Sequence, residues 1–123
     1  MVLPDLKLIK IVEMNKSPRM KIYIAGPYSK GDIIANVQIA IHEGDYVSNL
    51  GHVPYIPHLT AFWHLVRQHE YQFWLDYDME WLRVCDALLR LPGESSGADK
   101  EVIEAQRLGL IIYHSIFDIP RIA

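Results

Sequence analysis

The stretch of sequence that decides the fold is KIYIAGPYS, residues 21–29. Its first five residues are rich in β-branched and aromatic side chains, which favours a strand, and Gly26 with Pro27 then forms a turn signal. Directly afterwards, over 32–50, apolar residues recur at helical spacing until Gly51 ends the pattern. This part of the chain therefore predicts a strand, a turn and a helix in succession.

The rest of the chain continues the alternation of strands and helices. The pattern predicts strands at 52–56, 86–91 and 110–113, helices at 60–67, 70–84 and 99–108, and a loop at 94–98. An alternation of this kind predicts an α/β fold, a parallel sheet with helices on both faces. In such sheets a ligand binds beyond the carboxyl ends of the strands, which here are the segments 26–30, 57–60 and 92–97.

Length and composition are typical of one soluble domain. The chain has 123 residues, half of them apolar, which is enough for a single core. A net charge of −3 without a basic block argues against a nucleic acid polymer as partner. The single cysteine, Cys85, excludes an internal disulfide, and no apolar run approaches the ~20 residues of a membrane span. We therefore expect a cytoplasmic protein without a membrane partner.

Residues 1–19 differ in character from the rest. Leu6, Leu8, Ile9 and Ile11 have the composition of a short strand, and 15–19 resemble a linker. Two interpretations stay open for this segment: an N-terminal extension, or an edge strand or oligomer contact. Residues 20–123 are predicted to form a single α/β domain.

Several common cofactor motifs are incomplete in this sequence. Gly26 and Gly31 have the spacing at which a phosphate-binding P-loop begins, but Asp32 follows where the motif requires lysine. The dinucleotide fingerprint G-x-G-x-x-G is absent, and neither His42 nor His69 begins an H-E-x-x-H zinc motif. We therefore expect no ATPase activity, no dinucleotide cofactor and no catalytic metal.

The segment PGESSGADKE, residues 92–101, leads from a predicted strand into a predicted helix. A Gly/Ser loop at a helix start offers unpaired backbone N–H groups to an anion. Glu101 is expected in the first turn, where the helix dipole favours a carboxylate by about 0.3–1 kcal/mol. An ionised and positioned carboxylate is what a glycosidic nucleophile requires. A capping box formed by Ser96 and Asp99 is the structural alternative, and it leaves Glu101 unexplained.

Two further segments carry polar groups near the expected site. Gly26 after the first strand lets a ligand approach the backbone, and Tyr28 and Ser29 add hydroxyls, although an ordinary turn explains them equally well. Asp78 lies off the centre of the aromatic stripe of the helix expected at 70–84. Its carboxylate is therefore either directed into the cleft or an ordinary solvated group.

Together these segments resemble the nucleoside 2-deoxyribosyltransferase superfamily, which includes the 2′-deoxynucleoside 5′-phosphate N-hydrolases. The resemblance covers about residues 20–113. It rests on the glycine turn at 26–29, the D-x-x-x-L pattern at 78–82 and the G-x-x-x-E pattern at 97–101. It implies a Rossmann-like, flavodoxin-like fold that usually forms a dimer or larger assembly, with no cofactor.

The resemblance also implies a double displacement. Glu101 attacks C1′ of the sugar, the base departs, and water or a second base resolves the intermediate. Asp78 orients the sugar and assists the base, and a hydroxyl near the nucleophile is assigned to Tyr28. The substrate-binding residues that it implies are Gly26, Pro27, Ser29, His58, Ser95 and Gly97.

Ser95 decides between two substrate classes within the resemblance. Deoxyribosyltransferases that take free nucleosides often carry aspartate at this position, whereas serine is similar to the nucleotide hydrolases, because a carboxylate would repel a phosphate dianion. We therefore expect hydrolysis of the N-glycosidic bond of a (deoxy)nucleoside 5′-monophosphate, although Lys30 is the only cation in 26–32. The alternatives are a base-exchanging transferase, a non-catalytic nucleotide-binding module and a purely structural oligomeric domain.

Aromatic residues are concentrated between 62 and 81. They include Phe62, Trp63, Tyr71, Phe73, Trp74 and Trp81. This is more aromatic surface than a short helix pair usually buries, which predicts a homodimer or larger homo-oligomer. The competing interpretation is a core beneath long helices.

Overall fold

The computed structural model describes residues 18–122. Most of the segment 1–19, including the strand suggested at 6–11, lies outside the described residues, so both interpretations of that segment stay open. Within the described part, four parallel strands form one sheet in the order β2-β1-β3-β4. Their bounds are Lys21–Ala25 (β1), Val53–Tyr55 (β2), Ala87–Arg90 (β3) and Ile111–Tyr113 (β4). The predicted α/β fold with a parallel sheet is confirmed.

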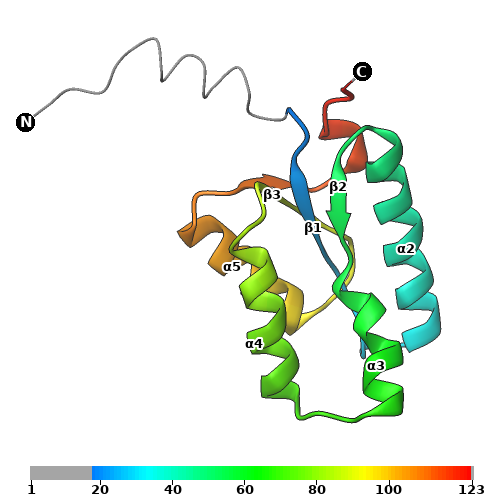
Figure 1. The fold of residues 1–123 in the computed structure, drawn as a ribbon. Coiled ribbons are helices and arrows are strands. Elements are labelled where there is room, and N and C mark those ends of the chain that lie inside the picture. The colour runs from blue at the N-terminus through cyan, green and yellow to red at the C-terminus, as the bar shows by residue number, and fades with distance from the viewer. Residues whose placement is uncertain (1–17, 123) are drawn as a thin grey trace, which may run out of the picture.

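Helices cover both faces of this sheet. They are α2 (Ile33–Asn49), α3 (Ala61–Val66), α4 (Tyr71–Leu82) and α5 (Ser96–Arg107), with short 3₁₀ turns η1 (Pro57–Thr60) and η2 (Ile116–Asp118). α2 lies on one side of the sheet and α4 and α5 on the other (Figure 1). None of the helices among residues 18–122 is long and apolar enough to cross a membrane.

The alternation of side chains along β1 produces two cores. Ile22 and Ile24 pack against Ala40 and Val47 of α2 in the first core. Because successive strand residues point to opposite faces, Tyr23 and Ala25 belong to the second core, which contains residues of α4 and α5: Leu82, Ala98 and Ala105. The phenol of Tyr23 is therefore directed toward α4 and α5.

The start of α5 differs from the expectation. The helix begins at Ser96, because the hydroxyl of Ser95 accepts a hydrogen bond from the backbone N–H of Ala98 at 3.0 Å and caps it. The predicted helix start at residue 99 is therefore three residues too late, the alternative of a capping box from Ser96 and Asp99 is not formed, and Asp99 instead pairs with Arg90 at 3.0 Å. Glu101 consequently lies in the second turn of the helix, beyond the short range over which the dipole stabilises a carboxylate.

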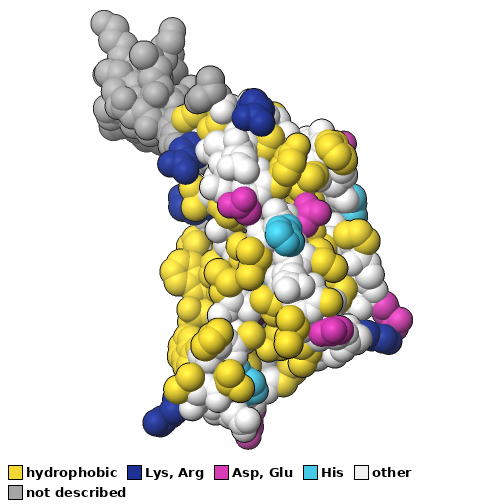
Figure 2. All heavy atoms as spheres, turned by 90° about the vertical axis from the view of Figure 1, so that its right-hand side faces the viewer, with side chains coloured by type: hydrophobic (Ala, Val, Ile, Leu, Met, Phe, Trp, Pro, Cys, Tyr) yellow, Lys and Arg dark blue, Asp and Glu magenta, His cyan; other side chains and the backbone are white. Residues whose placement is uncertain are grey.

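Apolar side chains remain on the surface of the described residues. They gather over the face that α2 and α3 present (Figure 2), and Ile34 and Phe62 are 71% and 78% exposed. Trp63 packs edge-on against Trp74 and Tyr77 of α4, with ring centroids 4.9 and 5.4 Å apart, so part of the aromatic cluster packs on itself. The homo-oligomer stays a prediction.

Candidate functional site

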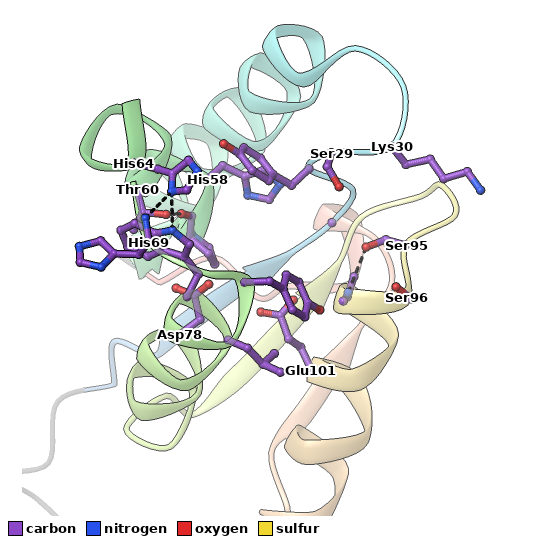
Figure 3. Close-up of a pocket in the computed structure, with 18 residues that line it drawn as sticks. Ser29, Lys30, His58, Thr60, His64, His69, Asp78, Ser95, Ser96 and Glu101 are labelled. Atoms are coloured by element: carbon purple, nitrogen blue, oxygen red, sulfur yellow. Dashed lines mark hydrogen bonds between the residues drawn. The ribbon is translucent and has the colours of Figure 1, made fainter. Parts of the chain in front are cut away.

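A cavity of about 450 Å³ opens at the carboxyl edge of the sheet. Its walls come from the loop after β1, from η1 and α3, from α4, and from the first turns of α5 (Figure 3). The predicted site residues that line it are Gly26, Tyr28, Ser29, His58, Asp78, Ser95, Gly97 and Glu101. Pro27 is not among the lining residues, but its carbonyl accepts a hydrogen bond from His58 Nε2 at 2.9 Å and so helps to hold that ring.

Two tyrosines on neighbouring strands hold the two carboxyl groups of the cavity. The hydroxyl of Tyr23 donates a hydrogen bond to Glu101 Oε2, and the hydroxyl of Tyr55 donates one to Asp78 Oδ1 at 3.3 Å. Tyr23 and Tyr55 are direct register partners of β1 and β2, with ring centroids 5.5 Å apart. The sheet thus positions side chains from α4 and α5 in one site.

Sequence reasoning missed both tyrosines and assigned the hydroxyl near Glu101 to Tyr28. The structure gives this contact to Tyr23, while the ring of Tyr28 packs edge-on against His58 with centroids 6.0 Å apart. The available signal was a tyrosine within an otherwise aliphatic strand, because a buried phenol usually requires a hydrogen-bond partner.

Burial changes the protonation of both carboxyl groups. It raises the pKa of Asp78 to about 7, against the hydrogen bond from Tyr55. It also raises the pKa of Glu101 to about 8. The hydrogen bond from Tyr23 opposes this rise, and so does the charge of Arg90, whereas the charge of Asp78 adds to it. The two groups titrate as a coupled pair, so near neutral pH the site can present one carboxylate and one carboxylic acid.

The raised pKa of Glu101 predicts a stability effect of Glu101→Gln. A carboxyl group that binds its proton more tightly in the folded state destabilises that state at higher pH. For Glu101 the effect grows as pH rises from 4.5, the ordinary pKa of the group, toward about 8, its pKa in the folded protein. Glutamine has no proton to lose and still offers Tyr23 an acceptor. We expect the variant to have a higher free energy of unfolding at pH 8, by on the order of 1–3 kcal/mol, and no gain at pH 4.

Urea denaturation of wild type and variant at pH 4, 6 and 8 measures this difference. Glu94→Gln is the matched control, because the side chain of Glu94 is 79% exposed and should give nearly the same difference at every pH. A gain for Glu101→Gln that did not depend on pH would contradict the burial argument.

His58 is held as a neutral ring in the wall of the cavity. The ring is buried, and burial lowers its pKa against the opposing effect of the Pro27 and Gly26 backbone. Its Nε2–H donates to the carbonyl of Pro27, which leaves Nδ1 as an acceptor with no hydrogen-bond partner among residues 18–122. His58 is therefore better suited to positioning a ligand than to carrying a positive charge.

Hydroxyl and backbone N–H groups form one end of the cavity. Ser96 and Gly97 occupy the first turn of α5, where backbone N–H groups have no acceptor within the helix, and Ser29 approaches from the loop after β1. Lys30 lies at the rim and pairs with Glu94 at 2.9 Å. This end has the chemistry of an anion site.

Aromatic and imidazole groups form the opposite end, which sequence reasoning did not assign to the site. The lining residues there include Thr60, His64, His69 and Trp74. The aromatic density of 62–81 was the available signal, but it was interpreted as an oligomer contact or a core. In residues 18–122, no group of three or more His, Cys, Asp and Glu side chains has an arrangement suited to a metal ion.

Comparison with known families identifies the same region of the chain. A family described as a domain of unknown function (DUF7768) matches residues 20–115. No curated protein matches the chain. The matched segment contains all four strands of the described sheet and every residue that lines the cavity.

Proposed function

Because the chain belongs to the DUF7768 family, whose description names no function, we propose an activity from the chemistry of its cavity. The proposed activity is hydrolysis of the N-glycosidic bond of a (deoxy)nucleoside 5′-monophosphate, with Glu101 as nucleophile and Asp78 as acid and base. This is also the activity implied by the resemblance to the nucleotide N-hydrolases.

The paired carboxyl groups carry the proposal. Glu101 and Asp78 line one cavity, are held by adjacent tyrosines and together retain a proton near neutral pH. Glycoside hydrolysis by double displacement requires one ionised carboxylate and one protonated carboxyl group at the same bond. Burial raises the pKa of Glu101 to about 8 and that of Asp78 to about 7, so the proposal requires the shared proton to pass from Glu101 to Asp78 when the substrate binds. The hydrogen bond from Tyr23 and the charge of Arg90 both favour the carboxylate form of Glu101.

The proposed reaction has two steps. A carboxylate oxygen of Glu101 bonds to C1′ as the C1′–N bond breaks, and the departing base takes both electrons of that bond and a proton from Asp78. Water then attacks C1′, the carboxylate of Asp78 accepts a proton from this water, and the bond from C1′ to Glu101 breaks. The products are the free base and a sugar phosphate, and both carboxyl groups return to their initial state.

The arrangement of the cavity supports one orientation of the substrate. Ser95 and Ser96 lie at one end, His64 and His69 at the other, and Asp78 lies on the histidine side of Glu101 (Figure 3). A 5′-phosphate on the first turn of α5 would place the sugar over Glu101 and the base beside Asp78. The phosphate dianion would then stay away from the carboxyl group of Asp78.

Incubation with a panel of nucleosides and 5′-monophosphates, with free base measured by chromatography, tests the proposed function. We expect base release from a monophosphate in the absence of any acceptor base. Release that requires an added base would instead identify a transferase. Tight nucleotide binding without release under any condition would identify a binding module.

Ser95→Asp tests the position of the phosphate. Aspartate is as good a helix cap as serine, so α5 should form normally, but a negative charge would lie beside the 5′-phosphate. We expect kcat/KM for the monophosphate to fall roughly 10²-fold or more, because close like charges cost several kcal/mol, while the value for the free nucleoside changes little. Ser95→Asn is the control, because asparagine caps a helix, has the size of aspartate and carries no charge. Equal losses on both substrates would contradict the phosphate site.

A further inference from the structure

Tyr71 lines the cavity without a role in the proposed reaction. It is the first residue of α4, and the residues of this helix that line the cavity are Tyr71, Trp74, Leu75 and Asp78. Steps of three and four residues keep side chains on one face of a helix, so this face of α4 forms one wall of the cavity. With a rise of about 1.5 Å per residue, Tyr71 lies roughly 10 Å along the helix axis from Asp78.

The hydroxyl of Tyr71 lies beside the first turn of α5. A methyl group at position 97 would lie 3.7 Å from Tyr71 Oη and 4.0 Å from Ser95 Oγ. Because Gly97 has no side chain, nothing on that residue separates the phenol from the backbone of α5. Tyr71 therefore reaches from α4 to the anion end of the cavity.

Several hydrogen-bond donors at this end have no acceptor in the described part of the chain. They include the hydroxyl of Tyr71 and the backbone N–H groups of Ser96 and Gly97. The oxygen of Ser95 accepts the N–H of Ala98, so the proton of that hydroxyl is also available to a ligand. A single ligand group that meets all of these donors must be rich in acceptors. A phosphate meets this requirement, because its oxygens are strong acceptors.

A positive charge lies next to the ring of Tyr71. The ammonium of Lys100 lies over this ring, 5.7 Å from the ring centroid, which is within the range of a cation–π contact. Lys100 follows Gly97 by three residues in α5, so the contact joins α5 to the start of α4. It stabilises the ring of Tyr71 in the wall of the cavity, and the charge favours an anion nearby.

We propose that Tyr71 binds the phosphate of the substrate, with its hydroxyl donating to a phosphate oxygen between α4 and the first turn of α5. The inference rests on the proposed function in taking the anion to be a 5′-phosphate. The two helices then share one division of tasks. The first turn of each helix binds the phosphate, and the acid further along each helix, Asp78 or Glu101, acts at the glycosidic bond.

Binding of ribose 5-phosphate and 2-deoxyribose 5-phosphate, the two sugar products that the proposed reaction allows, tests Tyr71 without turnover and without a choice of base. Tyr71→Phe removes only the hydroxyl, and because Tyr71 is 61% exposed the variant should keep the wild-type melting temperature. We expect isothermal titration to give an affinity about 10-fold or more weaker in Tyr71→Phe, because hydrogen bonds to charged groups are strong. Tyr46→Phe, at an exposed tyrosine of α2 outside the lining of the cavity, is the control and should bind as wild type does. Equal affinities of Tyr71→Phe and wild type, or no binding of either compound to wild type, would overturn the inference.

Kinetics compare the same variant on substrates with and without a phosphate. In Tyr71→Phe, KM for a 5′-monophosphate should rise about 10-fold with little change in kcat, and kcat/KM for the corresponding nucleoside should stay the same. Equal losses on both substrates would show that Tyr71 supports the shape of the site and does not bind the phosphate, and the inference would be wrong. Weaker binding of the sugar phosphates to Tyr71→Phe together with no base release from any nucleotide would refute the proposed function and support the phosphate site. Base release from a monophosphate with an unchanged KM in Tyr71→Phe would support the proposed function and overturn the inference.

Discussion

Glu101→Gln is expected to abolish base release, with kcat for the preferred monophosphate falling roughly 10³-fold or more. The amide of glutamine has nearly the shape of the carboxyl group and still accepts from Tyr23, but it cannot form the bond to C1′. The site should therefore stay assembled, and substrate affinity should change far less than kcat. Chromatography of free base measures the rate, and equilibrium binding of the monophosphate measures the affinity.

A chemical rescue separates a lost nucleophile from a damaged site. In Glu101→Ala the missing side chain leaves space beside C1′, and added azide, a small anionic nucleophile, should restore part of the base release and form a sugar azide. Glu80→Gln, which removes an exposed carboxylate that pairs with Arg83 outside the lining of the cavity, should keep wild-type rates with or without azide. Turnover of Glu101→Gln within about 10-fold of wild type would show that Glu101 is not the nucleophile.

Asp78→Asn is expected to lower kcat/KM for ordinary monophosphates by about 10²–10⁴-fold, the usual contribution of a general acid. A nucleotide of 7-methylguanine has a base that is already positively charged and departs without taking a proton. Its cleavage should be nearly insensitive to Asp78→Asn and fully sensitive to Glu101→Gln. This contrast tests the assignment of the two roles.

The pH dependence provides a second measure of the acid. The two carboxyl groups share a proton, with pKa values raised to about 7 for Asp78 and about 8 for Glu101, so the wild-type rate should fall as pH rises above about 8 and the site loses this proton. Asp78→Asn should lose this alkaline decline. Asp76→Asn on the same helix is the matched control, because Asp76 is exposed and bonds to Gln72 outside the cavity. Equal losses on the ordinary and the methylated nucleotide would contradict the acid role.

Local sequence patterns were sufficient to predict the sheet and the region of the site. The alternation of apolar runs and helical spacing reflects neighbours within one element, and it predicted the parallel strands around β1. The carboxyl ends of parallel strands lie at one edge, so polar residues after each strand could be assigned to a common site, and Glu101, Asp78, Ser95 and His58 do line one cavity. The helix was predicted to begin at residue 99 but begins at Ser96, and the capping-box alternative misplaced the cap by one residue, because Ser95 and Ser96 are both good caps and only the backbone conformation distinguishes them.

The sequence by itself determined the residue types and their order, including an acid on each of two helices and tyrosines within two strands. Tertiary structure alone decided that β1 and β2 pair with Tyr23 opposite Tyr55, so that these hydroxyls reach Glu101 and Asp78. It also decided the protonation of the two acids, because a carboxyl group loses its water only when helices and sheet close around it. The hydrogen bonds that His64 Nδ1 accepts from His69 and Trp74 likewise form only in the folded chain.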